Sequence, residues 1–261
     1  MALSKLTRKF NHWSISNFQL RNIFFCLPWK WQIRHNLTTY QDCVIKKENQ
    51  TTEIDFSLID TTTRYKILCA SILPRPIALV SSCSRDGLIP NLANFSFFMP
   101  VTSDPATLAF SVTRKYNHDK KDTLVNIEET GHFVVNHLPH YIFDKAYKAS
   151  KEFPSDVNEF QAVGLTPTPS KCGIAPCVLE SPISLECKLF QLVQVGSGKY
   201  GSSTLIIGEV VYSHFRGVSY EDGKIDVRSL QSVSRLDGMN YGNAAISFTV
   251  DNNEIWSFKH W

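Results

Sequence analysis

The chain has 261 residues, 43% hydrophobic and 20% charged, which is enough to bury the core of one large domain or two small ones. Its formal net charge is +3, yet residues 1–41 hold six basic side chains and no acidic one, leaving 21 basic against 24 acidic residues in the body. A slightly acidic body without a basic stripe argues against nucleic-acid binding. Seven cysteines with no Cys-x-x-Cys pair indicate buried thiols in a reducing compartment, not a disulfide framework.

Residues 1–41 form a basic N-terminal arm whose composition is typical of a mitochondrial transit peptide, with Arg, Lys, Ser and Thr but no Asp or Glu. Its longest apolar run, residues 23–29, is interrupted by Pro28 and is too short to span a bilayer. We therefore expect a protein of the mitochondrial matrix, without membrane insertion; the alternative is a cytoplasmic protein with an untranslocated tail. Residues 42–59 are polar and are typical of a linker.

Two strands joined by a tight turn form the centre of the predicted body. Residues 77–82 follow two prolines and are typical of a buried strand, and an Asp-Gly turn leads into a returning strand over residues 91–98. Period-two alternation places Ala93, Phe95 and Phe97 on one face of the returning strand and Asn94, Ser96 and Phe98 on the other. An aromatic wall beside small polar groups suits a flat heteroaromatic ligand. The alternative is an ordinary barrel hairpin.

Further helices and strands are expected around this hairpin. A short helix over residues 61–71 precedes it, with apolar side chains on its inner side, namely Tyr65, Leu68 and Ile72. The elements expected after it are a strand over 106–112, a helix over 122–131, a strand over 132–138, an amphipathic helix over 141–150, a shaped loop over 158–169, and strands over 183–195 and 204–215. The strand over 183–195 alternates as a half-buried strand does, with Ser184, Glu186 and Lys188 facing out.

The start of the helix expected after Lys121 has the features of an anion site. A helix N-terminus carries unpaired N–H groups and a partial positive charge. Lys121 adds a full charge and Thr123 a hydroxyl, which together are enough for a terminal phosphate. Asp122 would repel a phosphate that it faced, so we expect it to cap the helix or to orient Lys121. The alternative is a plain capped surface helix with a solvated lysine.

Histidines and cysteines do not predict a metal site in this sequence. His132 and His137 are five residues apart on one expected strand, so they face opposite sides of it. His137 and His140 flank a turn that has no acidic cluster beside it. Zinc bound through Cys172 and Cys177 would need two more ligands that the neighbouring sequence does not offer. We therefore predict no metal ligand.

The order of short motifs along the body is similar to that of a known family. The run ILPRPIALVSS over residues 72–82, the Asp-Gly turn and PNLANFSFF over residues 90–98 resemble the FMN-binding split barrel of the flavin reductase-like proteins, in their flavoredoxin branch. The likeness covers residues 60–241 and continues through the segments 103–105, 110–112, 121–124, 126–131, 133–136, 159–160, 164–167, 180–182, 185–187 and 207–210.

The resemblance implies a mainly β protein, a six-stranded antiparallel split barrel with a few flanking helices over residues 60–243, followed by a C-terminal extension over residues 244–261. It also implies a homodimer with FMN in a groove near the subunit interface. The residues that it implies at the cofactor are Arg75, Pro76, Asn94, Phe95, Ser96, Phe97, Ser111, Val112, Lys121, Asp122, Thr123 and Ser150.

The activity implied is hydride transfer from NADH or NADPH to the flavin, with electrons passed on to a redox partner protein. The flavin carries that chemistry while the protein aligns the two rings, so we name no catalytic residue. Many short flavin reductases have a histidine where this chain has Ser203-Thr204, which counts against nicotinamide turnover more than against flavin binding. Two alternatives follow: an FMN electron carrier with little nicotinamide turnover, and a barrel that has lost its flavin.

Overall fold

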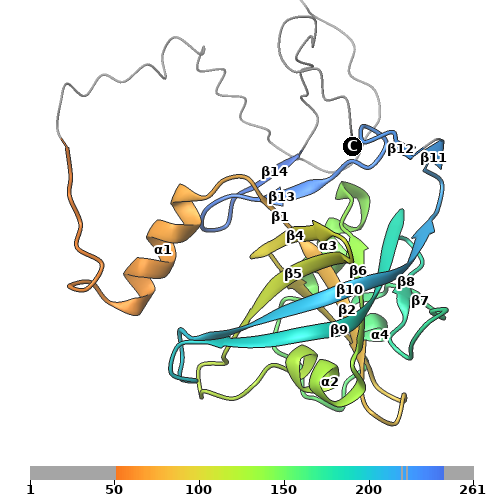
Figure 1. Cartoon of the computed structure of the whole chain (residues 1–261), viewed down its shortest axis with the longest axis horizontal. Coiled ribbons are helices and arrows are strands. Elements are labelled where there is room, and N and C mark those ends of the chain that lie inside the picture. The colour runs from red at the N-terminus through yellow and green to blue at the C-terminus, as the bar shows by residue number, and fades with distance from the viewer. Residues whose placement is uncertain (1–50, 219, 222, 244–261) are drawn as a thin grey trace, which may run out of the picture. The chain divides into compact units, whose positions relative to one another are not determined.

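The computed structural model describes residues 51–243 except 219 and 222, and Figure 1 shows their arrangement. The basic arm over residues 1–41, most of the linker over 42–59 and the extension over 244–261 lie outside the described residues, so what we expect of them stays a prediction. Within the described part, no helix combines the length and the apolarity needed to cross a bilayer.

The described residues contain many strands and few, short helices. The helices are α1 Thr61–Ser71, α2 Asp122–Thr130, η1 His140–Ile142 (a 3₁₀ helix), α3 Phe143–Lys148 and α4 Glu159–Val163. The strands are β1 Arg75–Pro76, β2 Ala78–Cys83, β3 Pro90–Phe95, β4 Phe98–Ser103, β5 Ala106–Thr113, β6 His132–His137, β7 Pro167–Thr168, β8 Cys177–Val178, β9 Ile183–Val195, β10 Ser203–Phe215, β11 Tyr220–Glu221, β12 Lys224–Ile225, β13 Val233–Arg235 and β14 Tyr241–Asn243.

The main sheet is a split barrel. Seven antiparallel strands follow the order β3-β2-β6-β9-β10-β5-β4. The two edge strands, β3 and β4, are separated in the chain only by Ser96 and Phe97, so the sheet must curl until its edges come together. The mainly β, split-barrel class is therefore confirmed. The sheet has seven strands where we expected six, because the chain after Phe97 adds an edge strand to β5.

Aromatic rings fill the barrel interior. Phe110 on β5 lies at its centre, with ring centroids 5.0 Å from Phe95 and 5.4 Å from Phe133. A second apolar cluster packs η1, α3 and α4 against the outer side of β2 and β3, where Leu79 and Leu92 are fully buried. Because both of its faces are covered, β2 is buried at every position, as its sequence predicts.

Gly208 on β10 faces this interior with no room for a side chain. A Cβ added there would lie 2.3 Å from Cζ of Phe133, a ring that is 1% exposed and cannot move aside. We expect Gly208→Ala to lower the free energy of unfolding by about 1–3 kcal/mol, the usual cost of overpacking a core. Urea unfolding followed by circular dichroism measures this loss. Adding Phe133→Leu should recover part of it, and a Gly208→Ala variant as stable as the wild type would contradict the packing described here.

Most of the expected elements are confirmed. The structure has the helix over 61–71, the strand over 106–112, the helix that ends at Gly131, the strand over 132–138 and the two long strands. The signals were local: the Asp60 carboxylate caps α1 by accepting from the backbone N–H groups of Thr62 and Thr63, and Gly131 ends α2 in the left-handed region at φ 68°.

Four expectations about these elements are wrong. The returning strand over 91–98 breaks at Ser96, since β3 ends at Phe95 and β4 begins at Phe98. The expected helix over 141–150 is split into η1 and α3, and the expected loop over 158–169 begins with α4. The inner side assigned to the first helix is exposed, with relative exposures of 53%, 43% and 59% for Tyr65, Leu68 and Ile72.

The outward face of β9 is covered at its start, which corrects the half-buried pattern. Ser184 is fully buried and Glu186 is 2% exposed, although both were expected to face solvent. The loop over residues 170–176 and strand β8 lie over them, and backbone N–H groups of Lys171 and Cys172 donate to the Glu186 carboxylate. Alternation alone does not predict this cover, because the segment that forms it comes from elsewhere in the chain.

Candidate cofactor-binding site

Two cavities meet at Asn94 and Ser150, on the outer side of β3. The first has a volume of about 180 Å³ and is lined by Tyr65, Ile77, Asn94, Ser96, Leu138, Phe143, Tyr147, Ser150, Arg235 and Tyr241. The second has a volume of about 140 Å³ and is lined by Asn91, Ala93, Asn94, Lys115, Lys121, Asp122, Thr123, Ala149, Ser150, Lys151, Glu152, Phe153 and Glu159. Since they share two residues, they form one groove with two compartments.

The first compartment, which we call the ring pocket, combines four aromatic side chains with polar ones. The Tyr241 ring lies 4.6 Å from Phe143 and 6.2 Å from Tyr147, edge-on to both, and the Arg235 guanidinium lies 4.4 Å from the Tyr241 ring centroid. These side chains come from α3 and from the β13–β14 hairpin, whose rings contact one another at the pocket. Such a pocket suits a flat aromatic ligand with polar edges.

Asn94 stands at the junction with one hydrogen-bonding atom unused. Its Nδ2 donates to the carbonyl of Ala146 at 2.5 Å and to Oγ of Ser150 at 3.1 Å, which fixes the amide plane. Its Oδ1 is buried and has no hydrogen-bond partner among the described residues. A buried acceptor without a partner is costly, so this oxygen points to a ligand that donates to it.

The second compartment, which we call the phosphate pocket, lies at the N-terminus of α2. Lys121 is the N-cap residue, and the first backbone N–H groups of the nine-residue helix follow it. Thr123 is buried, and its Oγ1 accepts from Nδ2 of Asn91 at 2.9 Å, so its hydroxyl hydrogen remains to donate. Asp122 does not cap the helix, contrary to expectation; it forms an ion pair with Lys115 at 3.3 Å.

Glu159 adds a buried carboxyl group to the phosphate pocket. It is 7% exposed and accepts a hydrogen bond from the backbone N–H of Leu92. Burial raises the pKa of Glu159 to about 7; the Leu92 hydrogen bond opposes the rise and the nearby Asp122 adds to it. Near neutral pH this group therefore exchanges a proton, and in its neutral form it adds no negative charge beside the lysines.

Glu159 should make stability depend on pH. The folded chain holds this proton more tightly than the unfolded chain, whose ordinary pKa is 4.5, so its contribution to the free energy of unfolding falls as pH rises from 4.5 to about 7. Glu159→Gln keeps an acceptor for Leu92 and should remove that fall. Urea unfolding of both proteins in steps between pH 5 and pH 8 checks this. A difference between them that stays constant with pH would contradict the assignment.

The structure brings half of the twelve predicted binding residues to the groove. Those that line it are Asn94, Ser96, Lys121, Asp122, Thr123 and Ser150. Phe95 and Val112 instead point into the barrel core, with exposures of 6% and 1%. Ser111 pairs with Leu205 on β10, and Pro76 lines a neighbouring apolar cavity of about 410 Å³, which shares Ile77 and Leu138 with the ring pocket. Any contact of these four with a cofactor stays a prediction.

Arg75 and Phe97 lie beside the groove and support it. The Arg75 guanidinium is 6.0 Å from the Phe97 ring centroid, and Phe97 lies 6.2 Å from Tyr65 in the ring pocket. Arg75 donates to the carbonyls of Cys69 and Ile72 at the end of α1 and, at 2.6 Å, to that of Leu236 between β13 and β14. Its described contacts are therefore structural: they tie α1 to the β13–β14 hairpin, which lie near each other in Figure 1.

Several lining residues were missed by the sequence analysis. They are Tyr65, Phe143, Tyr147, Arg235 and Tyr241 in the ring pocket and Lys115 and Glu159 in the phosphate pocket. The likeness to the family reaches residue 241 and includes the segment 159–160, which was a signal for Arg235, Tyr241 and Glu159. The sequence near the other residues gives no such signal, because their roles depend on how distant segments pack.

A split barrel with an aromatic pocket joined to a basic pocket at a helix N-terminus defines a protein that binds an aromatic, anion-bearing cofactor. The chain matches the model of the flavin reductase like domain over residues 70–224, more than half of its length. This chain belongs to the flavin reductase-like family. That membership supports a flavin-linked oxidoreductase with a flavin cofactor.

Relatives and solved structures agree with this family. A protein of Halalkalibacterium halodurans described as uncharacterized is 36% identical over 193 residues, which are 73% of this chain and 91% of that protein. Nitrilotriacetate monooxygenase component B from Bacillus cereus superposes with a TM-score of 0.73 at 32% identity, covering 77% of this chain and 100% of its own. The 2-nitrobenzoate 2-nitroreductase of Pseudomonas fluorescens gives 0.70 at 29% identity, covering 80% and 100%.

Proposed function

We propose that this protein binds FMN in the groove and transfers a hydride from NADH or NADPH to it. The observation that carries the proposal is the meeting of the ring pocket and the phosphate pocket at Asn94. An aromatic compartment, an unused buried acceptor and a basic helix N-terminus match, in that order, the ring, the polar ring edge and the terminal phosphate of FMN.

The residues have separate tasks in this proposal. Lys121, Thr123 and the first N–H groups of α2 hold the phosphate, and Lys115 is held in place by Asp122. Oδ1 of Asn94 accepts from the polar edge of the ring system, and Tyr241 limits its movement and excludes water. Bound flavin supplies the hydride-accepting chemistry, so the protein aligns the reactants and supplies no acid or base.

A visible absorption spectrum tests the proposal directly. The full chain is mixed with FMN, freed of unbound flavin by gel filtration, and then treated with NADH or NADPH without oxygen. We expect a yellow protein whose flavin absorption bleaches rapidly with one of the two nucleotides. A protein that retains no flavin would overturn the proposal.

A second candidate is an FMN electron carrier with little nicotinamide turnover. It is favoured by Ser203 and Thr204, which stand where many short flavin reductases have a histidine, and Thr204 is 4% exposed in the structure. A yellow protein that bleaches with dithionite but not with either nicotinamide nucleotide would support this candidate over the first.

We also propose that the chain forms a homodimer. Strands of one sheet expose large apolar side chains, including Met99 on β4, Phe190 on β9 and Tyr212 on β10, with exposures of 54%, 57% and 44%. Leu68 on α1 and Ile72 directly after it are also exposed. Single exposed apolar residues are ordinary, but groups of them on neighbouring elements are typical of an interface.

Phe190→Asp is expected to shift this dimer to the monomer, because a carboxylate would be buried without a partner in the interface. Light scattering during gel filtration measures the mass of each protein. Leu88→Asp, at the exposed turn between β2 and β3, is the matched control and should stay dimeric. A monomeric wild type would refute the dimer outright.

A further inference from the structure

Three side chains of metal-binding type converge outside the cofactor groove. Cys177 on β8, Glu186 on β9 and His214 on β10 each direct a ligand atom to one place, and these atoms lie within 4.8 Å of one another. None of the three residues lines the ring pocket or the phosphate pocket. The sequence near Cys177 offers no further metal ligands, because Glu186 and His214 stand on strands that only the fold brings beside it.

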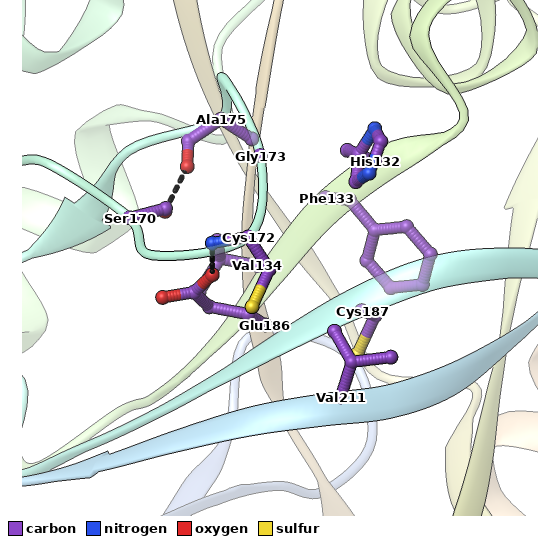
Figure 2. Close-up of a pocket in the computed structure, with 10 residues that line it drawn as sticks. All are labelled: His132, Phe133, Val134, Ser170, Cys172, Gly173, Ala175, Glu186, Cys187 and Val211. Atoms are coloured by element: carbon purple, nitrogen blue, oxygen red, sulfur yellow. Dashed lines mark hydrogen bonds between the residues drawn. The ribbon is translucent and has the colours of Figure 1, made fainter.

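The surrounding chain holds Glu186 in place. Backbone N–H groups of Lys171 and Cys172 donate to its two oxygens at 2.7 and 2.6 Å, and Figure 2 shows the bond from Cys172. Nε2 of His214 lies 2.5 Å from Oε1 of Glu186. The carboxylate is thus held in one orientation, as metal-ligating carboxylates are.

Burial also favours a bound cation. Cys177 is fully buried with its Sγ 3.7 Å from Oγ of Ser170, Glu186 is 2% exposed, and the His214 side chain is 17% exposed. Within the cluster, the imidazole is therefore in contact with solvent and the thiol is not. A buried carboxylate needs a positive partner. A metal cation bound by both the carboxylate and the deprotonated thiol neutralises both negative charges.

We propose that Cys177, Glu186 and His214 form a binding site for a zinc-type divalent transition-metal ion. Thiolate, imidazole and carboxylate are the three ligand types that Zn²⁺ uses in proteins, with bonds of about 2.0–2.3 Å. Ligand atoms around one tetrahedral ion stand about 3–4 Å apart, so the imidazole needs to move outward by about 1 Å from Glu186. His214 is the ligand with space to do so, since it lies at the solvent edge.

Binding replaces the proton of the Cys177 thiol, which is released to solvent, and Nε2 of His214 binds the ion in the tautomer that carries its hydrogen on Nδ1. The ion would join β8 and its preceding loop to the long strands β9 and β10. Three protein ligands leave one tetrahedral position for water.

Cobalt titration tests this site. The full chain, loaded with FMN and dialysed against a chelator, is titrated with Co²⁺ and then with Zn²⁺. We expect one equivalent of Co²⁺ to produce a thiolate-to-cobalt charge-transfer band with visible bands of a four-coordinate ion, both removed by Zn²⁺. Cys177→Ser should lose the charge-transfer band. His214→Asn should weaken Zn²⁺ binding by more than about 100-fold, beyond the effect of changing an outer-shell residue.

Cys172→Ser is the matched control, because this thiol lies in the same loop but outside the ligand cluster. It should keep the charge-transfer band. Where Cys177→Ser folds poorly, the melting temperature gives a second measurement: Zn²⁺ should raise it in the wild type and in Cys172→Ser but not in His214→Asn. A wild type without a cobalt band, a band that survives Cys177→Ser, or one lost in Cys172→Ser would each overturn the proposal.

Discussion

Asn136→Leu is expected to lower the free energy of unfolding by about 4 kcal/mol or more, a loss reserved for broken buried networks. The Asn136 side chain is fully buried on β6. Its Nδ2 donates to the carbonyl of Leu79 at 3.1 Å and to Oγ of Ser81 at 3.0 Å. Its Oδ1 accepts from the backbone N–H of Val178 at 2.9 Å and from Oγ of Ser184 at 2.8 Å. Leucine has the same branched shape as asparagine but leaves these partners buried and unpaired.

The four bonds join β6 to β2, β8 and β9, so their loss should loosen the covering strand β8 as well as the barrel. Urea unfolding gives the stability change. Asn126→Leu is the control: Asn126 on α2 donates one bond, to Oγ of Ser82 at 3.1 Å, and its loss should cost about 1 kcal/mol. Equal losses of unfolding free energy in the two variants would show that the four Asn136 hydrogen bonds stabilise the fold no more than the single Asn126 bond does.

Lys121→Met is expected to weaken FMN binding by about 10- to 150-fold, the equivalent of about 1.5–3 kcal/mol for a hydrogen bond to a charged group. Lys121 lines the phosphate pocket and forms no ion pair within the described residues, whereas Lys115 is already paired with Asp122. Methionine keeps the length of the side chain and the helix, so the lost charge is the main change. Fluorescence titration with FMN measures the affinity.

Riboflavin, which lacks the phosphate, separates this effect from a general disturbance of the site. Its affinity should be nearly the same in the wild type and in Lys121→Met. Lys120→Met is the neighbouring control, because Lys120 points to Glu128 at 2.6 Å and is absent from the pocket lining. A variant that lost riboflavin and FMN equally would place Lys121 outside the phosphate contact.

Local signals in the sequence were enough for most of the fold and for one end of the site. Capping residues and glycines predict where α1 and α2 begin and end, and these predictions succeed because the interactions lie within a few residues along the chain. The charge and hydroxyl of Lys121 and Thr123 predict a phosphate site; both residues line one pocket, and phosphate binding there stays a prediction. The resemblance to the family added the split barrel and placed Asn94 at the groove.

The failures have a common physical cause, which is packing between distant segments. Alternation predicts an aromatic wall of Phe95 and Phe97, but the strand breaks after Phe95, so one ring enters the core and the other lies outside. Glu186 was expected to face solvent because nothing beside it in the sequence indicates that residues 170–176 cover it. Arg235 and Glu159 enter the groove from segments far from its centre.

The contacts of Arg75 have a practical consequence for handling the protein. One guanidinium ties the last turn of α1 to the hairpin that carries Arg235 and Tyr241, so both ends of the domain lead directly into the wall of the ring pocket. An affinity tag fused close to either end, or a protease cut there, is therefore expected to weaken the proposed cofactor binding. A label attached at Arg85, on the exposed turn between β2 and β3, lies away from these contacts and should leave the yellow colour intact.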